Sequence, residues 1–135
     1  MFKRFCARYY NSMSRYVVLD FETYPVDGQS FLMEIGCVEV VDGVIGKTFQ
    51  SLVRPVSQVS RFVLNLTGIN QKDLEEAPEF FDIMDEFYGF ISNSIVVAHN
   101  ANLDCLSYEA FCRHLSIEPR QFLWVDSQDI IKLID

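Results

Sequence analysis

The pattern of apolar and polar positions divides the chain into a first half rich in strands and a second half in which strands alternate with helices. Three runs of β-branched and aromatic residues predict strands at Tyr16–Phe21, Phe31–Val41 and Val44–Val53. The dipeptide Asp42-Gly43 between the last two runs is typical of a tight hairpin turn. Tyr24–Ser30 contains a proline and a glycine and predicts a loop. Arg54-Pro55 ends the third strand, because proline cannot donate a hydrogen bond to a neighbouring strand. The first half therefore predicts an antiparallel meander.

Two helices are expected next. Ser60–Leu66 predicts a short helix closed by Gly68, and Pro78 suits the first turn of a longer helix because its missing N–H needs no partner there. In that longer helix, apolar residues recur at the spacing of one helical face: Phe80, Phe81, Met84, Phe87, Tyr88 and Ile91. Such a stripe belongs to a hydrophobic core far more often than to a ligand site. We therefore expect all six residues in the core.

The last third alternates between short strands and helices. Ile95–Ala98 is a fully apolar run of the kind found in parallel sheets, and Phe122–Val125 predicts a fifth strand. Between them Ala101–Leu115 predicts a helix, and Ser127–Ile134 begins another. The expected inward residues of the first of these helices are Leu103, Leu106, Ala110, Phe111 and Leu115. Antiparallel strands followed by strand–helix units predict an α/β fold, with a mixed five-stranded sheet flanked by helices.

Composition supports one globular domain and narrows the classes of partner. The chain has 135 residues, half of them hydrophobic, with 12 Phe and 6 Tyr to fill a core. No stretch approaches the roughly 20 apolar residues that cross a bilayer, so we expect no membrane partner. The net charge of −8 argues against tight, sequence-independent binding to duplex nucleic acid, which needs Lys and Arg for phosphate contacts. It leaves room for a nuclease whose bound cations offset the negative charge.

Residues 1–15 differ from the rest of the chain, and we separate this basic segment from a domain at 16–135. The segment contains no acid but four basic residues and two serines: Lys3, Arg4, Arg8, Arg15, Ser12 and Ser14. This is the composition of an organellar transit peptide. The alternatives are an ordinary basic terminus, or translation that starts at Met13. We expect a cytoplasmic protein, or one of an organellar matrix if the segment is a transit peptide.

The four cysteines do not predict a metal site. Cys6, Cys37, Cys105 and Cys112 form no Cys-x-x-Cys pair and show no histidine spacing typical of zinc. We expect buried, reduced thiols and therefore a reducing, intracellular setting.

Three carboxylates follow predicted strands. Asp20 and Glu22 come directly after Tyr16–Leu19, and residues i and i+2 of a strand point to the same face, so their side chains are neighbours. Asp104 lies in the first turn of the helix after Ile95–Ala98. If the two strands are adjacent, the three carboxylates converge, which is unfavourable unless a divalent cation lies between them. Oxygen donors alone indicate Mg²⁺ or Mn²⁺ rather than zinc, and two such ions would suit phosphodiester cleavage.

The ordered set of motifs resembles a known nuclease family. Taken singly, Asp20 and Glu22 could be surface acids and Asp104 a partner of the helix dipole. Their combination with the neighbouring segments resembles the DEDD (DnaQ-like) superfamily of 3′–5′ exonucleases, in the branch of the bacterial DNA polymerase III proofreading subunits. The segments that carry the resemblance are Val18–Thr23, Met33–Val38, Leu66–Ile69, Ala77–Phe80, Val97–Asp104 and Trp124–Ser127.

This resemblance implies a ribonuclease H-like fold and a two-metal 3′–5′ exonuclease that releases nucleoside 5′-monophosphates from single-stranded 3′ ends. The catalytic residues and ligands of Mg²⁺ or Mn²⁺ that it implies are Asp20, Glu22 and Asp104. It also places Thr23 and Asn100 near the terminal nucleotide. Glu34 and Asp126 are not among the four acids of the family, so we interpret them as supporting residues.

The last motif of the family has no counterpart in this chain. That motif brings a fourth Asp, with a His five residues before it or a Tyr four residues before it to orient the attacking water. His99 belongs to the second motif, whereas His114 and Tyr108 precede Pro119 and Cys112 at these spacings. The remaining late acids come too early and lie on the wrong elements, unless one is recruited: Asp126, Asp129 and Asp135.

The incomplete set of motifs leaves three hypotheses open. The chain could be a nuclease whose remaining part lies in a longer or decayed reading frame, a domain that binds nucleic acid or nucleotide without catalysis, or an inert remnant. The final helix of the family would cover one face of the sheet. Without it we expect exposed apolar area on that face, covered by a polymerase or another protein.

Overall fold

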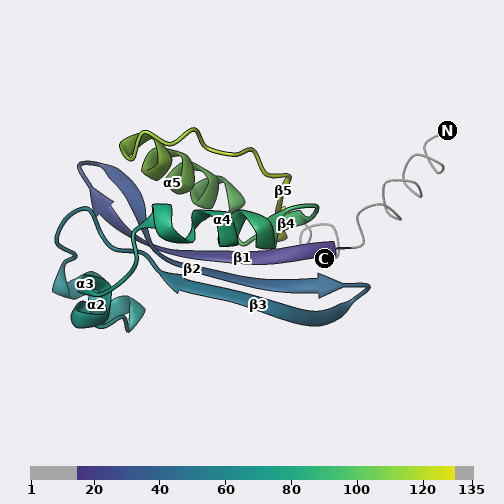
Figure 1. Ribbon diagram of the computed structural model, residues 1–135, viewed down its shortest axis with the longest axis horizontal. Coiled ribbons are helices and arrows are strands. Elements are labelled where there is room, and N and C mark those ends of the chain that lie inside the picture. Colours follow the sequence, from purple (N-terminus) through teal and green to yellow (C-terminus); the bar gives the residue numbers. More distant parts are fainter. Residues whose placement is uncertain (1–14, 130–135) are drawn as a thin grey trace.

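The computed structural model describes residues 15–129 and contains a five-stranded mixed sheet in the order β3-β2-β1-β4-β5 (Figure 1). The strands are β1 (Arg15–Val26), β2 (Gln29–Val41), β3 (Val44–Leu52), β4 (Ile95–Ala98) and β5 (Trp124–Asp126). β1, β2 and β3 are antiparallel, β4 runs parallel to β1, and β5 runs parallel to β4. The predicted mixed sheet is therefore confirmed.

Tight turns join the three antiparallel strands. All four turn residues have positive φ, between 47° and 80°: Asp27, Gly28, Asp42 and Gly43. Two consecutive residues with positive φ match the right-handed twist of a hairpin, so the predicted turn between β2 and β3 is confirmed. The loop predicted at 24–30 is wrong, because β1 continues to Val26 and pairs with β2 across Pro25. Tyr24 is buried in the core, and this burial outweighs the turn signal of the proline beside it.

The described helices are α2 (Arg61–Thr67), α3 (Gln71–Glu75), α4 (Phe80–Ile91) and α5 (Ala101–His114). α2 begins and ends as expected, since the Val63 N–H donates to Ser60 Oγ at 3.2 Å and Gly68 follows with φ 74°. The short helix α3 was not predicted. Pro78 precedes α4 by two residues instead of entering its first turn, and the Glu79 N–H donates to the Asp82 carboxylate there at 3.2 Å.

The fifth strand, near the end of the described region, starts later than expected. β5 starts at Trp124, whereas the prediction began it at Phe122. The predicted helix Ser127–Ile134 starts with helical residues 127–129, and its remainder lies outside the described residues.

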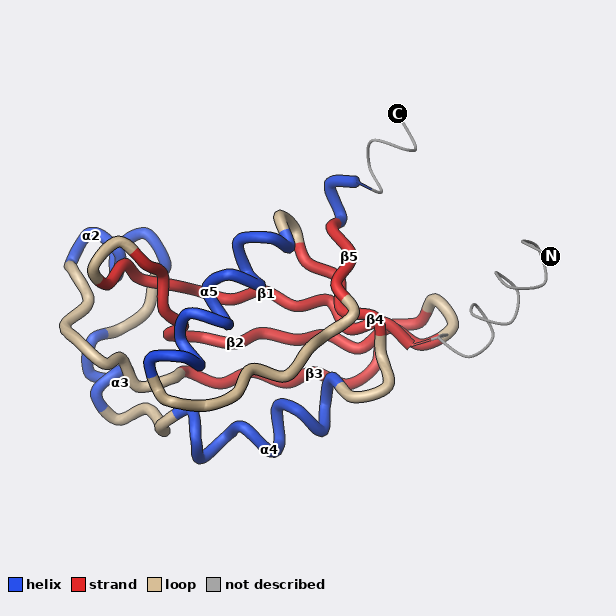
Figure 2. Tube along the Cα trace, turned by 90° about the horizontal axis from the view of Figure 1, so that it is seen from above, coloured by secondary structure: helices blue, strands red, loops and turns tan. Residues whose placement is uncertain are grey.

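α4 and α5 lie on the same face of the sheet, and α2 and α3 lie at one end (Figures 1 and 2). α5 packs mainly on β2, and α4 contacts β3. Aromatic rings fill the space between helices and sheet: the ring of Phe87 on α4 lies 6.3 Å from Phe21 and 5.9 Å from Phe49, centroid to centroid. Phe80 of α4 lies 5.6 Å from Phe111 of α5, so the two helices share one core.

Three residues predicted to lie in the core are exposed. Phe81 is 71% exposed, Leu103 is 58% exposed and Leu106 is 50% exposed. The buried face of α5 is formed instead by Ala101, Ser107, Tyr108, Ala110, Phe111 and Cys112. The prediction followed the most apolar residues, whereas the helix turns its aromatic and small residues to the sheet. The prediction for Phe81 is wrong for a related reason, because the buried face of α4 is centred on Phe87.

The described part of the chain begins with an anchored residue. Arg15 Nε donates to the Glu39 carboxylate at 2.7 Å, and its guanidinium also donates to the carbonyls of Phe90 and Ser92. Arg15 is therefore part of β1, while the rest of the predicted basic segment lies outside the described residues. None of the helices in 15–129 is both long enough and apolar enough to span a bilayer.

The cysteine prediction is confirmed for two positions. Cys37 and Cys112 are buried free thiols, and burial raises the pKa of Cys37 to about 12. Cys105 is free but only half-buried, and its thiol donates to the Glu109 carboxylate at 3.5 Å. Cys6 lies outside the described residues.

Candidate active site

β1 presents Asp20 and Glu22 on the face of the sheet that α4 and α5 leave open. The alternate positions Val17, Leu19 and Phe21 are buried in the core, whereas Asp20 is exposed and Glu22 half-buried. The pairing of β1 with β2 shifts by one residue between Glu22 and Thr23, a bulge that bends the strand at the site. A hollow of about 360 Å³ opens beside Asp20, so its carboxylate is accessible.

Asp104 reaches β1 from the first turn of α5. β4 pairs with β1 only as far as Val18, so the following part of β1 has a free edge on that side. The backbone of Phe21 hydrogen-bonds to the Asp104 carboxylate at this edge. Asp104 thereby lies next to the strand position between Asp20 and Glu22, and the structure brings the three predicted acids into one region.

The acids of this region repel one another. Burial, followed by the charge of Asp20, raises the pKa of Asp104 to about 7, and the charges of Asp126 and Glu22 add to the effect. Burial also raises the pKa of Glu22, followed by Asp20 and by Glu34, which pairs with Glu22 across β1 and β2. Negative charges from four elements therefore meet where a cation would be stabilised.

Asp126 supports the start of α5, a supporting role that the sequence predicts without indicating its partners. Its carboxylate accepts the N–H groups of Asn100 at 3.1 Å and Ala101 at 3.0 Å, the first two of the turn that opens α5, and that of Gln128 at 2.9 Å. These three N–H groups hold its pKa below the usual range. Asn100 has φ 65° and its side chain does not cap the helix, so Asp126 supplies the cap from β5. The only available signal was topological, because Asp126 pairs with Ala98 at the end of β4.

The donor set fits Mg²⁺ or Mn²⁺, since the side chains that meet here are carboxylates. Within 15–129, however, no three His, Cys, Asp or Glu side chains already lie close enough together to hold a metal ion. Asp20 is near enough to raise the pKa of both Glu22 and Asp104 without forming a closed ligand cluster with them. Like charges oppose such convergence, and a divalent cation would remove that opposition.

The remaining predicted site residues flank these acids. Thr23 follows Glu22 in β1 and is half-buried, and Asn100 is half-buried at the start of α5. The two histidines have other contacts. His99 Nδ1 lies 3.0 Å from Ser127 Oγ and its Nε2 lies 3.2 Å from Gln128 Nε2, while the ring of His114 packs at 4.9 Å on Phe31.

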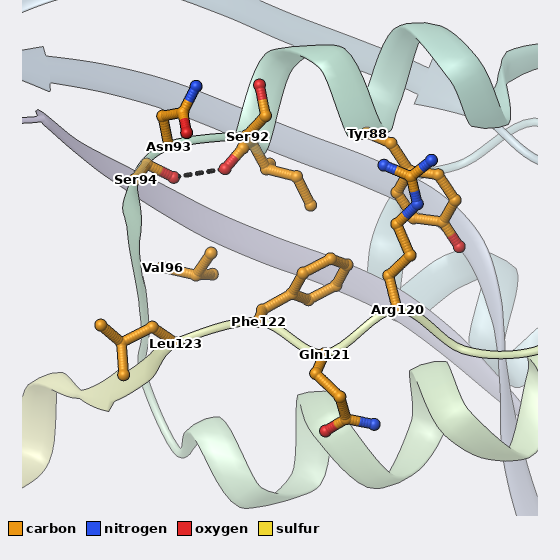
Figure 3. A pocket seen from close by; sticks show the side chains of 10 residues that line it. Tyr88, Ser92, Asn93, Ser94, Val96, Arg120, Gln121, Phe122 and Leu123 are labelled. Atoms are coloured by element: carbon orange, nitrogen blue, oxygen red, sulfur yellow. Dashed lines mark hydrogen bonds between the residues drawn. The ribbon is translucent and has the colours of Figure 1, made fainter.

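A pocket of about 160 Å³ lies away from these carboxylates, at the opposite end of β4 (Figure 3). It borders Ser94 and Val96, whereas Asp104 follows the other end of this strand. Its only charged lining residue is Arg120, whose guanidinium lies 4.5 Å over the ring of Tyr88. With no carboxylate in its lining, this pocket is not the site that the sequence predicts.

Known proteins share this arrangement of elements. A family model described as Exonuclease (RNase_T) matches residues 17–131. In solved structures, the nuclease domain of 3′hExo, described as a DEDDh family member bound to rAMP, has a TM-score of 0.77 at 19% identity and covers 87% of this chain and 68% of that one. Exonuclease X in complex with 5′ overhanging duplex DNA has a TM-score of 0.69 at 24% identity, covering 88% and 63%. These likenesses establish the fold.

Two relatives come from bacterial replication. A PolC-type DNA polymerase III of Thermotoga petrophila is 44% identical over 90 residues, which are 66% of this chain and 7% of the relative. The DNA polymerase III subunit epsilon of Buchnera aphidicola is 36% identical over 97 residues, covering 67% and 41%. The chain thus spans less than half the length of either relative. The resemblance to the DnaQ-like superfamily is confirmed, and the chain belongs to the Exonuclease (RNase_T) family of 3′–5′ exonucleases.

Proposed function

We propose that this chain binds the 3′ end of a nucleic acid strand at Asp20, Glu22 and Asp104 and hydrolyses its terminal phosphodiester bond, releasing a nucleoside 5′-monophosphate. One observation carries the proposal: Asp104 of α5 hydrogen-bonds to the β1 backbone at Phe21, and its pKa is raised by the acids on either side. Carboxylates whose pKa is shifted by burial and by neighbouring charges cluster at functional sites. Membership of the exonuclease family supports the choice of reaction.

The three carboxylates would hold Mg²⁺ or Mn²⁺, and two such ions supply an activated water and stabilise the leaving oxygen. The contribution of the chain itself is to position the carboxylates. The Phe21 backbone orients the Asp104 carboxylate, and Asp126 fixes the start of the helix that carries it. Thr23 and Asn100 flank the acids in sequence and are half-buried, which suits contacts to the terminal nucleotide.

A second candidate function is binding of a 3′ end or a nucleotide without turnover. The contacts of the histidines favour it, because His99 is engaged by Ser127 and Gln128, and His114 packs on Phe31. Both rings are thus engaged by residues other than the three carboxylates. We also propose a DNA polymerase as the protein partner, since the relatives named above are a PolC-type polymerase and the epsilon subunit.

The decisive experiment offers a 5′-labelled single strand to the purified chain with Mn²⁺ and follows its shortening on a gel. Hydrolysis predicts stepwise loss from the 3′ end that Asp104→Asn abolishes and Asp85→Asn, an exposed acid of α4, leaves unchanged. Calorimetric titration with thymidine monophosphate and Mn²⁺ completes the design. Binding without shortening, lost in Asp104→Asn, would establish the second candidate. A folded chain that does neither would overturn both.

A further inference from the structure

The pocket at the start of β4 differs in charge from the rest of the chain (Figure 3). The chain has 19 acidic and 11 basic residues, yet Arg120 is the only charged one among the described residues that line this pocket. The remaining lining comes from the end of α4, the turn after it, the start of β4 and the segment before β5, and it is apolar or uncharged. The pocket therefore suits a ligand that carries negative charge.

Two tyrosines hold Arg120 in place. The central carbon of its guanidinium lies 4.5 Å from the centre of the Tyr88 ring, and its backbone N–H donates to the Tyr108 hydroxyl at 2.9 Å. The two tyrosine hydroxyls are 2.7 Å apart, so the side chain and the main chain of Arg120 rest on one hydrogen-bonded pair. Within residues 15–129 the guanidinium forms no ion pair. Because stacking uses only the face of the guanidinium, the N–H groups on its edge remain available to a carboxylate.

The other part of the pocket offers apolar surface. Phe122 is half-buried, and its ring packs on Tyr108 at 5.0 Å and on Trp124 at 5.7 Å, centroid to centroid. Val96 of β4 lies beside Phe122 in Figure 3, and Leu123 is 45% exposed. The sequence pattern assigns Phe122 and Leu123 to the fifth strand, whereas in the structure they precede it and border the pocket.

The volume limits the ligand to about one side chain. A cavity of about 150 Å³ takes a benzene ring, and this pocket holds about 160 Å³. Pockets for ligands of several rings begin at about 300 Å³, so a nucleotide with its base, sugar and phosphate exceeds the space. Arg120 and Phe122 are two residues apart in one segment, so the pocket presents its cation and its apolar surface side by side.

We propose that this pocket docks the carboxyl-terminal residue of a partner polypeptide that ends in an apolar side chain such as Phe or Leu. The side chain lies on Phe122, and the terminal carboxylate pairs with Arg120. Charge complementarity identifies the occupant, because a terminal residue carries a carboxylate and an apolar group on one Cα atom. The exposed amide of Asn93, which has no hydrogen bond within the described part of the chain, donates to the preceding peptide carbonyl. The site lies at the other end of β4 from Asp104 and does not depend on the proposed function.

The test is a titration of the full chain with N-acetylphenylalanine in a chelator, followed through the backbone amide resonances in NMR spectra. A ligand of this size is expected to bind with a dissociation constant on the order of 1 mM. The shifts should be confined to residues 91–96 and 120–123. N-acetylphenylalanine amide keeps the side chain without the charge, and N-acetylglycine keeps the charge without the side chain. Both should bind at least about threefold more weakly, as expected for the loss of one exposed ion pair or of the apolar contact.

Matched variants assign the carboxylate contact. Arg120→Gln should lower the affinity for N-acetylphenylalanine to that for its amide, while Arg113→Gln, which removes an exposed guanidinium of α5 outside the pocket, should leave it unchanged. Equal affinities for the acid and the amide, or no saturable shift up to about 20 mM ligand, roughly 20 times the expected dissociation constant, would overturn the proposal. Tighter binding of thymidine monophosphate to the same resonances would overturn it in favour of a nucleotide.

Discussion

Individual neighbouring groups have opposing effects on the protonation of Asp104. Burial and the charges of Asp20, Asp126 and Glu22 favour its protonated form, while the Phe21 N–H favours the carboxylate. The first set is stronger, so its pKa lies near 7. Without a cation, the folded chain therefore retains a proton near neutral pH that an unfolded aspartate, with a pKa of about 3.9, has already lost.

This difference predicts how metal-free stability depends on pH. The folded state binds more protons than the unfolded state between about pH 4 and pH 7, so the free energy of unfolding falls as pH rises through that window. Asp104→Asn removes this contribution. In urea titrations with a chelator, the variant should gain stability relative to the unaltered chain on going from pH 5 to pH 8. A pH-independent difference between Asp104→Asn and the unaltered chain would contradict the assignment.

The grouping of the three acids could be predicted from the sequence because each is tied to local signals. Asp20 and Glu22 alternate along an apolar strand, and Asp104 opens a helix directly after another. The capping role of Asp126 could not be identified in this way, because its partners lie 25 and 26 residues earlier in the chain. That contact depends on two parallel strands being side by side, which no local pattern encodes.

Among the elements, α5 depends on a cap that it does not carry itself. Its first N–H groups are accepted by Asp126 at the end of β5, so the helix and the strand support each other. Because α5 carries Asp104, this cap connects the stability of the sheet edge to the geometry of the site.

Removing the cap should loosen the start of α5. Asp126→Ala removes acceptors for three backbone N–H groups, so we expect a lower melting temperature and faster hydrogen exchange at residues 100–104. Asp126→Asn keeps one acceptor oxygen and should lose less. The pKa of Asp126 is depressed in the folded chain, so its contribution is present above about pH 3.9 and is lost as pH falls through the lower folded value. Unchanged exchange in Asp126→Ala would argue against the cap.

α4 offers a matched pair of phenylalanines for measuring the core. Phe87 is fully buried among aromatic rings, whereas Phe81 on the same helix is 71% exposed. Phe87→Ala should lower the free energy of unfolding by about 3–5 kcal/mol. Phe81→Ala should change it by no more than about 0.5 kcal/mol. Chemical denaturation of both variants checks the difference, and similar losses would show that α4 is rotated from the orientation described.

Elements with strong local signals were predictable, and those set by long-range pairing were not. The Asp42-Gly43 hairpin and the Ser60 and Gly68 caps follow from short-range chemistry. The extension of β1 across Pro25 depends on burial of Tyr24. Leu103 and Leu106 point outward because a different face of α5 packs on the sheet. The spacing of the apolar residues alone does not indicate which face that is.

For the molecule as a whole, the negative charge and the incomplete ligand cluster both make the stability of the folded chain depend on cations. The net charge of −8 disfavours the compact state through repulsion, and the carboxylates of β1, α5 and β5 add a local concentration of charge. Any cation relieves the general repulsion by screening, whereas a divalent ion bound at the site stabilises the folded chain specifically. Salt and Mg²⁺ should therefore act differently.

Thermal unfolding at pH 8 separates the two effects. Mg²⁺ should raise the melting temperature further than NaCl of equal ionic strength, because an ion that binds only the folded chain adds about 2.7 kcal/mol at a concentration of 100 times Kd. Asp104→Asn should retain the response to NaCl and lose the additional response to Mg²⁺, since screening does not need that carboxylate. Lowering the pH to 5 should also reduce the additional response, because Asp104 is then protonated in the folded chain. Identical responses to the two salts at pH 8 would mean that Asp20, Glu22 and Asp104 hold no divalent ion in this chain.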